Sequence, residues 1–217
     1  AVAASPDALF AACYSSGDPG HSAILFKYRL RDFEVLEELE SSYEVNPPED
    51  EDDEDDCGEW DEYFAAPADL LVVSDQLYLC DRGGECGSPS VVVFDLALQH
   101  LFTFGIARHR ADAFFDSERR FVIPAKKKGV LLGPEALTSK DGLIYVADTV
   151  ADRVKVFDLH GNFQRVVLCN RKPFVAPISI AFARGRLLVG EFESLASSSH
   201  GRRVKVLTPD GVLLQTV

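Results

Sequence analysis

The sequence has no methionine among its 217 residues, a single tryptophan, and no apolar run of the length that a membrane-spanning helix requires. Its first residues, Ala1–Asp7, lack the basic segment and long apolar core of a secretory signal peptide, so none is expected there. Because there is no initiator methionine, we expect a processed chain or a fragment of a longer one. The composition, 47% hydrophobic and 26% charged, is that of an ordinary globular domain.

The cysteines are odd in number and show no Cys-x-x-Cys spacing, which argues against a disulfide framework or a zinc site. They are Cys13, Cys57, Cys80, Cys86 and Cys169. Cys80 and Cys86 are close enough in sequence to pair across a loop, but reduced thiols in a cytoplasmic protein are the expectation. Three of them, Cys13, Cys80 and Cys169, occur in apolar runs, where a free cysteine behaves as a small hydrophobic residue.

The net charge of −13 is distributed unevenly along the chain. Residues 1–100 contain four basic and 24 acidic side chains, whereas residues 101–217 contain 18 basic and 11 acidic ones. Eleven of the acidic residues lie within Glu49–Glu62. Like charges without apolar partners do not fold on themselves, so residues 41–66 are predicted to be a disordered acidic insertion. A docking segment for a basic partner and a loose calcium site remain alternatives.

A repeat of short β-rich segments separated by tight polar turns runs through the chain. Its clearest copy is at residues 143–168, and the tripeptide Phe-Asp-Leu recurs at 94–96 and 157–159. Four units are predicted, at about 1–40, 68–105, 133–168 and 176–217. Each of the last three units begins with a further strand, at Asp69–Val73, Glu135–Thr138 and Ile178–Ala183. Units of four strands that cannot bury both faces alone indicate an all-β propeller.

The segment Pro134–Gly161 resembles an NHL repeat, with its proline, Asp-Gly turn, Tyr-Val-Ala-Asp strand end and Val-x-Val-Phe strand. The resemblance implies a six-bladed β-propeller, of which four blades are visible. The missing blades would come from the rest of the chain or from another chain. Four repeat positions are expected to be structural: Asp148, Arg153, Phe157 and Gly161. Arg153 is the expected partner of Asp148. The aromatic residues Phe94, Tyr145 and Phe157 are expected to pack between blades.

In each unit, with strands a to d, the a–b and c–d turns are short and the insertions fall in b–c or d–a connections. These insertions are Arg82–Pro89, Glu193–Gly201, residues 41–66 and residues 106–131. All four are therefore predicted to project from one face of the disc, where long loops on a rigid scaffold usually bind.

The connection at 106–131 interleaves basic residues with Phe114, Phe115 and Phe121. This mixture is compatible with phosphate contacts and base stacking, and equally with a surface loop that has buried anchors. After the acidic run, Trp60, Tyr63 and Phe64 either pack the insertion onto the body or anchor a partner. The candidate binding residues are Arg108, Arg110, Arg119, Arg120, Lys126, Lys127, Lys128, Trp60 and Tyr63.

The alternative of a catalytic function can be examined by comparison with two families of enzymes that have similar blades. Lactonase-like propellers imply a metal held by Glu, Asn and Asp side chains, but here only Asp69 and Glu135 fall on innermost strands, too few for calcium. The peptidylamidoglycolate lyases imply zinc-bound histidines, whereas the histidines here fall in turns or peripheral loops. We therefore predict a non-catalytic protein-interaction scaffold without a cofactor. The alternatives are a lactonase-type hydrolase, with Ca²⁺ as cofactor, and an RNA-binding propeller.

Overall fold

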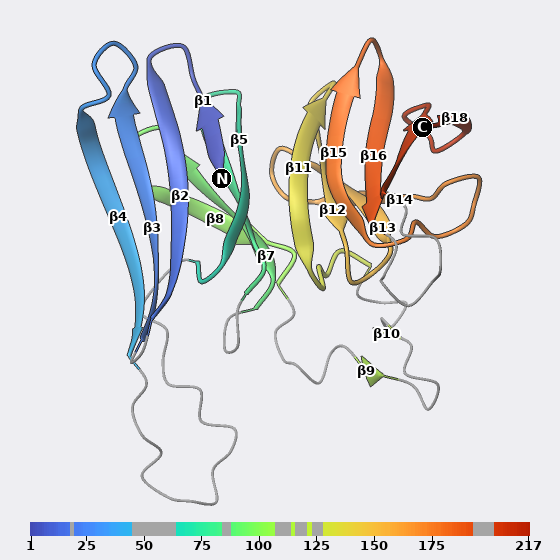
Figure 1. Ribbon diagram of the computed structural model, residues 1–217, viewed down its shortest axis with the longest axis horizontal. Coiled ribbons are helices and arrows are strands. Elements are labelled where there is room, and N and C mark those ends of the chain that lie inside the picture. Colours follow the sequence, from blue (N-terminus) through green and yellow to red (C-terminus); the bar gives the residue numbers. More distant parts are fainter. Residues whose placement is uncertain are drawn as a thin grey trace, which may run out of the picture. The chain divides into compact units, whose positions relative to one another are not determined.

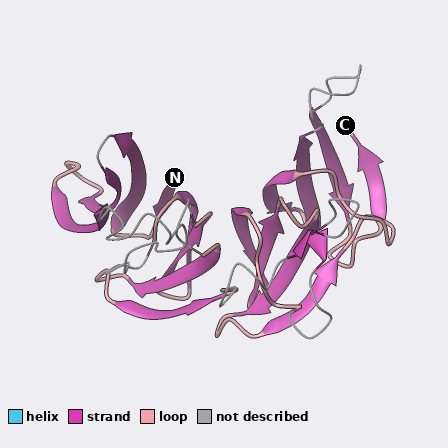
Figure 2. Cartoon of the chain, turned by 90° about the horizontal axis from the view of Figure 1, so that it is seen from below, coloured by secondary structure: helices cyan, strands magenta, loops and turns pink. Residues whose placement is uncertain are grey.

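The structure, a computed structural model, describes residues 1–17, 20–44, 64–83, 88–106, 114–115, 121–122, 128–192 and 202–217. Every regular element within these ranges is a β-strand (Figures 1 and 2). The chain forms two compact units. Unit 1 comprises Ala1–Gly87 and Val92–Phe102, and unit 2 comprises Ser88–Val91 and Thr103–Val217.

Sixteen of the strands form four antiparallel sheets, each paired in the order in which its strands follow along the chain. This all-β arrangement of four-stranded blades confirms the predicted propeller class. Blade 1 contains β1 (Val2–Ala4), β2 (Ala8–Gly17), β3 (Gly20–Arg29) and β4 (Val35–Glu44). Blade 2 contains β5 (Pro67–Val73), β6 (Gln76–Asp81), β7 (Ser90–Asp95) and β8 (His100–Phe104). Blade 3 contains β11 (Pro134–Lys140), β12 (Leu143–Asp148), β13 (Arg153–Asp158) and β14 (Phe163–Val167). Blade 4 contains β15 (Pro177–Ala183), β16 (Arg186–Phe192), β17 (Arg202–Leu207) and β18 (Leu213–Thr216).

Blade 1 differs most from its sequence prediction. It has an innermost strand, β1, which pairs with β2 and which the sequence did not reveal because three residues carry no readable alternation. Its outer strand β4 begins at Val35 and runs to Glu44, so strand occupies the first residues of the segment predicted to be disordered. Asp32 and Phe33 lie in the turn that precedes it.

Part of the 106–131 connection is regular. Phe114–Phe115 (β9) pairs antiparallel with Phe121–Val122 (β10). At its end, Val130 and Leu131 are buried, so the connection re-enters the core before β11 begins. Within the described residues, no helix is long and apolar enough to cross a membrane.

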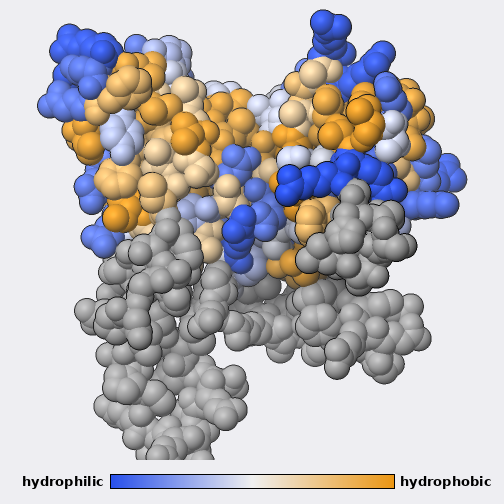
Figure 3. All heavy atoms as spheres, in the orientation of Figure 1, coloured by the Kyte–Doolittle hydropathy of each residue, from blue (hydrophilic) through white to orange (hydrophobic). Residues whose placement is uncertain are grey.

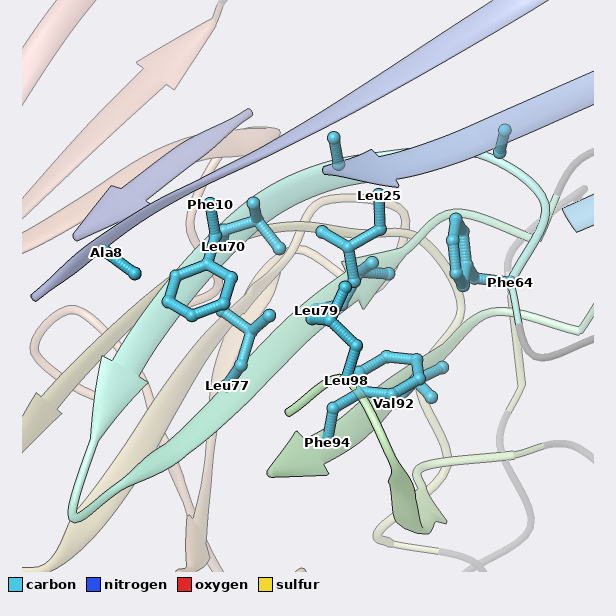
Figure 4. Packing of buried hydrophobic residues seen from close by; sticks show 12 residues of the cluster. Ala8, Phe10, Leu25, Phe64, Leu70, Leu77, Leu79, Val92, Phe94 and Leu98 are labelled. Carbon is cyan, nitrogen blue, oxygen red and sulfur yellow. The ribbon is translucent and has the colours of Figure 1, made fainter. Parts of the chain in front are cut away.

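In unit 1, one face of blade 1 packs on one face of blade 2 (Figure 4). Blade 1 contributes Phe10 and Leu25, and blade 2 contributes Leu77, Leu79 and Phe94, all with no exposed surface. We call the face of a blade that packs on the next blade along the chain its forward face, and the opposite face its rear face.

Unit 2 repeats this packing with residues at matching positions. The forward face of blade 3, with Tyr145 and Val156, packs on the rear face of blade 4, with Leu187, Val189 and Leu207. The alternation of side chains along each strand separates the two faces, so each blade has an apolar set on both.

The antiparallel order places the b–c and d–a connections at one end of each blade and the a–b and c–d turns at the other. We call these the loop end and the turn end. In blade 4, for example, β16 ends and β17 begins at the loop end, whereas the turn between β17 and β18 lies at the turn end. In each blade taken by itself, the long insertions therefore leave from the loop end.

Candidate functional site

A buried carboxylate marks the end of strand b in blades 2, 3 and 4. These residues are Asp81, Asp148 and Glu191, each at most 3% exposed. In blade 3, Oδ1 of Asp148 accepts hydrogen bonds from the backbone N–H groups of Leu132 (3.0 Å) and Gly133 (2.9 Å). The carboxylate thus fastens the segment that leads into the innermost strand to the loop end of the neighbouring strand.

The same arrangement recurs in the other two blades. Asp81 accepts hydrogen bonds from the N–H groups of Ala65 (3.1 Å) and Ala66 (2.7 Å), and Glu191 accepts one from Val175 (2.8 Å). The residue after each acid completes the link through a backbone bond. These bonds run from Arg82 to Ala66, from Thr149 to Gly133 and from Phe192 to Ala176. Three loop ends are therefore held by the same hydrogen-bonding pattern.

In blades 3 and 4 a lysine on strand c neutralises the acid. Lys155 Nζ lies 2.6 Å from Oδ2 of Asp148 and also donates to the carbonyl of Val130. Lys205 Nζ lies 2.7 Å from Oε1 of Glu191. Burial lowers the pKa of Lys155, and the charge of Asp148 opposes that shift.

Blade 2 has Val92 at the lysine position, so among the described residues Asp81 has three backbone donors and no cation beside it. Burial raises the pKa of Asp81, and the N–H groups of Ala66, Gly83 and Ala65 act against that rise. The three acids therefore share a structural role but differ in electrostatic environment.

The structure pairs Asp148 with Lys155 and not with Arg153, the partner suggested by the sequence. Arg153 lies opposite Asp148 in the strand register, but its Nε donates to the carbonyl of Ala151 (2.9 Å). Lys155 follows two residues later on the same face of the strand, and its long stem carries the ammonium group to the buried carboxylate.

The other two repeat positions pack within unit 2. Phe157 is buried against Phe104 and Phe163, with ring centroids 4.8 Å and 5.9 Å apart. Gly161 has a φ of 78°, and a Cβ added there would lie 2.7 Å from Cβ of Phe104. Phe157 therefore serves packing, and Gly161 serves the geometry of the turn.

The connection between blades 3 and 4 is held firmly at the loop end. The N–H of Ala176 donates to Oδ1 of Asp152 (2.8 Å), and Thr149 Oγ1 donates to the carbonyl of Pro177 (2.6 Å). Ala176 has a φ of 39° and Asp152 a φ of 54°, both in the left-handed region that side-chain-bearing residues rarely adopt. The surrounding hydrogen bonds keep this backbone in place.

Large apolar side chains are exposed on this backbone. Val150, Val175 and Ile178 are between 40% and 43% exposed, and we call them the loop-end patch. Arg171 and Lys172, in the same connection as Val175, are exposed as well. Unit 2 therefore presents apolar side chains on a fixed backbone at the loop end. The basic residues follow Asn170, whose N–H donates to the carbonyl of Gly211 in the c–d turn of blade 4 (2.9 Å).

Sequence reasoning missed the patch because Val150 and Val175 lie in short connections and Ile178 lies in strand β15, not in the long insertions. Of the basic candidates in the 106–131 connection, the described residues include Lys128, which is exposed. The remaining candidates lie outside the described residues: Arg108, Arg110, Arg119, Arg120, Lys126, Lys127, Trp60 and Tyr63. Phe64 is described and buried, with its ring centroid 6.2 Å from that of Phe94.

The two candidate metal ligands occupy different repeat positions. Asp69 lies opposite Cys80 in blade 2, a position that Ala136 fills in blade 3. Glu135 falls in the irregularity between Pro134 and Ala136, which blade 2 fills with Ala68. Among the residues that the structure describes, no group of three or more His, Cys, Asp or Glu side chains could hold a metal ion.

Cys13 occupies the position of the buried acids in blade 1, and it is exposed, contrary to the expectation of a small buried hydrophobe. Cys80 and Cys169 are buried as expected.

Neither a model of a known protein family nor a curated protein matches the chain. Among solved structures, it is similar to the glutaminyl cyclase of Myxococcus xanthus, with 11% identity, a TM-score of 0.48, and coverage of 91% of this chain and 64% of that one. It is also similar to the WD40 β-propeller domain of Doa1, with 13% identity, a TM-score of 0.49, and coverage of 94% and 52%. The computationally designed Ika4 protein matches with 10% identity, a TM-score of 0.49, and coverage of 95% and 89%. The chain thus spans less than two thirds of the length of the first two proteins. At identities this low, the similarity bears on the fold alone.

Proposed function

We propose that the chain is a non-catalytic protein-interaction module of the NHL propeller type, and that it binds its partner through the loop end of unit 2. The observation that carries the proposal is the loop-end patch, Val150, Val175 and Ile178, exposed on a backbone that hydrogen bonds already fix. A preorganised apolar surface binds without the cost of ordering a loop.

The chemistry of the surface suggests the chemistry of the partner. Exposed Arg171 and Lys172 lie in the same connection as Val175, and the sequence places further basic residues in the 106–131 connection. We infer a partner segment with apolar side chains for the patch and acidic side chains for the basic surroundings. Apolar anchors supply most of the affinity in such interfaces, and charges at the rim mainly set the rate of association.

Affinity capture with the whole chain as bait tests the proposal. A Val150→Asp/Val175→Asp variant should lose the partner, with at least a roughly 30-fold weaker affinity, because about 2 kcal/mol is typical of buried anchors. The matched control is Phe33→Asp, which changes a side chain that is 64% exposed in the c–d turn of blade 1, in unit 1. Equal binding by both variants would contradict the proposal.

The two alternative functions, RNA binding and lactone hydrolysis, can each be measured on the same purified protein. An RNA-binding propeller would retain single-stranded RNA on a filter in a salt-dependent manner. A lactonase-type enzyme would gain thermal stability with Ca²⁺ and hydrolyse lactones. We expect neither result.

A further inference from the structure

The rear face of blade 1 is apolar, and its side chains remain partly exposed. Pairing registers place Val2, Leu9, Ala11, Phe26 and Tyr28 on this face, with the last two rings 5.8 Å apart. Val2 is 62% exposed and the other four are half-buried. In Figure 3, hydrophobic residues are visible at the surface over the strands of this blade.

The forward face of blade 4 has the same character. Leu188, Val204 and Val206 lie on it, and Val204 is 38% exposed. Phe192 follows on the same face and is also 38% exposed. Two apolar sheet faces, one at each end of the blade series, thus lack the burial that the other faces have.

The internal repeat shows how such faces are filled. In blade 3 the forward positions Tyr145, Val154 and Val156 are buried, and blade 4 has Leu188, Val204 and Val206 there. In blade 4 the rear positions Leu187, Val189 and Leu207 are buried, and blade 1 has Leu9, Ala11 and Tyr28 there. The forward face of blade 4 therefore matches a partner with the chemistry of the rear face of blade 1.

The charges on the two faces are opposite. Glu38 and Glu40 are exposed and lie opposite Phe26 and Ile24 on the rear face of blade 1. Arg186 and Arg202 are exposed at the two ends of the forward face of blade 4. The described residues on these faces include no charge that would oppose the pairing.

We propose that the occupant of each face is a second copy of this chain, bound head to tail. The forward face of blade 4 in one copy packs on the rear face of blade 1 in the next copy. Both halves of the interface are present in one sequence with matching repeat positions and complementary charge. Such contacts are heterologous, because two different surfaces of the chain meet. This inference is independent of the loop-end patch.

Sedimentation of the whole chain over a range of concentrations tests it. The wild-type chain should associate, and Val204→Glu and Phe26→Glu should each sediment as a monomer. A mixture of the two variants should form a one-to-one dimer, because the intact forward face of the Phe26→Glu chain meets the intact rear face of the Val204→Glu chain. Nonspecific association of apolar surfaces would not show this complementation.

Three results would overturn the proposal. They are a wild-type chain that stays monomeric at every concentration, a single variant that still associates, and a mixture of variants that remains monomeric. Circular dichroism melting verifies that the variants are folded. Since Phe26 is half-buried, Val35→Glu provides a second rear-face variant at a residue that is 48% exposed.

Discussion

Nζ of Lys155 and Oδ2 of Asp148 lie 2.6 Å apart, and their side chains are 1% and 0% exposed. The pair joins strands b and c of blade 3, and the same carboxylate accepts the N–H groups of Leu132 and Gly133. One buried ion pair therefore connects the core of a blade to the connection that enters it.

Removing the lysine should be costly because it leaves a buried carboxylate without a cation. We expect Lys155→Met to lower the free energy of unfolding by about 3–5 kcal/mol. Lys205→Met in blade 4 is the matched control and should cost less, because the Lys205 side chain is 16% exposed and water can reach the pair. Urea unfolding measures both, and equal costs would contradict this interpretation.

Asp81 should give unit 1 a pH dependence of the opposite sign to that of a salt-bridged carboxylate. Burial raises its pKa above the ordinary value of 3.8, so the folded state binds the proton more tightly than the unfolded state. Its contribution to stability is present below pH 3.8 and is lost as the pH rises through the raised pKa. As the pH rises across this range, the melting temperature of Asp81→Asn should therefore fall less than that of the wild type.

The turns between strands c and d each have one residue in the left-handed region, but the blades fill it differently. Phe33, Leu98, Gly161 and Gly211 have φ values of 55°, 54°, 78° and 91°. Leu98 is buried in the core, whereas Phe33 is 64% exposed and gains little packing there. We expect Phe33→Gly to stabilise the chain by up to about 1 kcal/mol. Leu98→Gly should destabilise it by about 2 kcal/mol or more, since it removes a core side chain. Thermal melts that rank the two variants the other way would refute this.

Two glycines with similar backbone angles separate strain from steric clash. Gly142 has a φ of 74° with nothing within 4 Å of an added Cβ, whereas the same atom at Gly161 would lie 2.7 Å from Phe104. Gly142→Ala should cost about 1 kcal/mol from the left-handed conformation alone. Gly161→Ala should cost roughly 1–3 kcal/mol more because Phe104 must move. Equal destabilisation in urea would show that the clash is relieved freely.

The sequence predicted the blades well where alternation and turns agree. The strand expected at Ile178–Ala183 is found at Pro177–Ala183, and Asp141 and Gly142 form the turn that the Asp-Gly pair indicated. These features are local, so a single sequence contains them. The short strand β1 depends on pairing with β2 and has no such local signal.

The candidate site was harder to predict because it depends on residues distant in sequence. Val175 lies in a connection whose adjacent N–H groups, at Val175 and Ala176, donate to Glu191 and Asp152, and no spacing in the sequence reveals these contacts. The Asp148–Lys155 pair spans a hairpin, and the sequence offered Arg153 as the nearer cation. Local pattern therefore predicted the scaffold, whereas tertiary hydrogen bonds determine the surface that it presents.

Site-specific photo-crosslinking tests the central claim most directly. A photoreactive phenylalanine analogue is placed at Val175 in the loop-end patch or at Phe33 in the c–d turn of blade 1, and the chain is illuminated in an extract of its source cells. Phe33 is more exposed than Val175, 64% against 41%, so accessibility alone would favour the control. We predict a discrete crosslinked protein partner from position 175 and none from position 33. A partner captured from position 33, or none from position 175, would contradict the account.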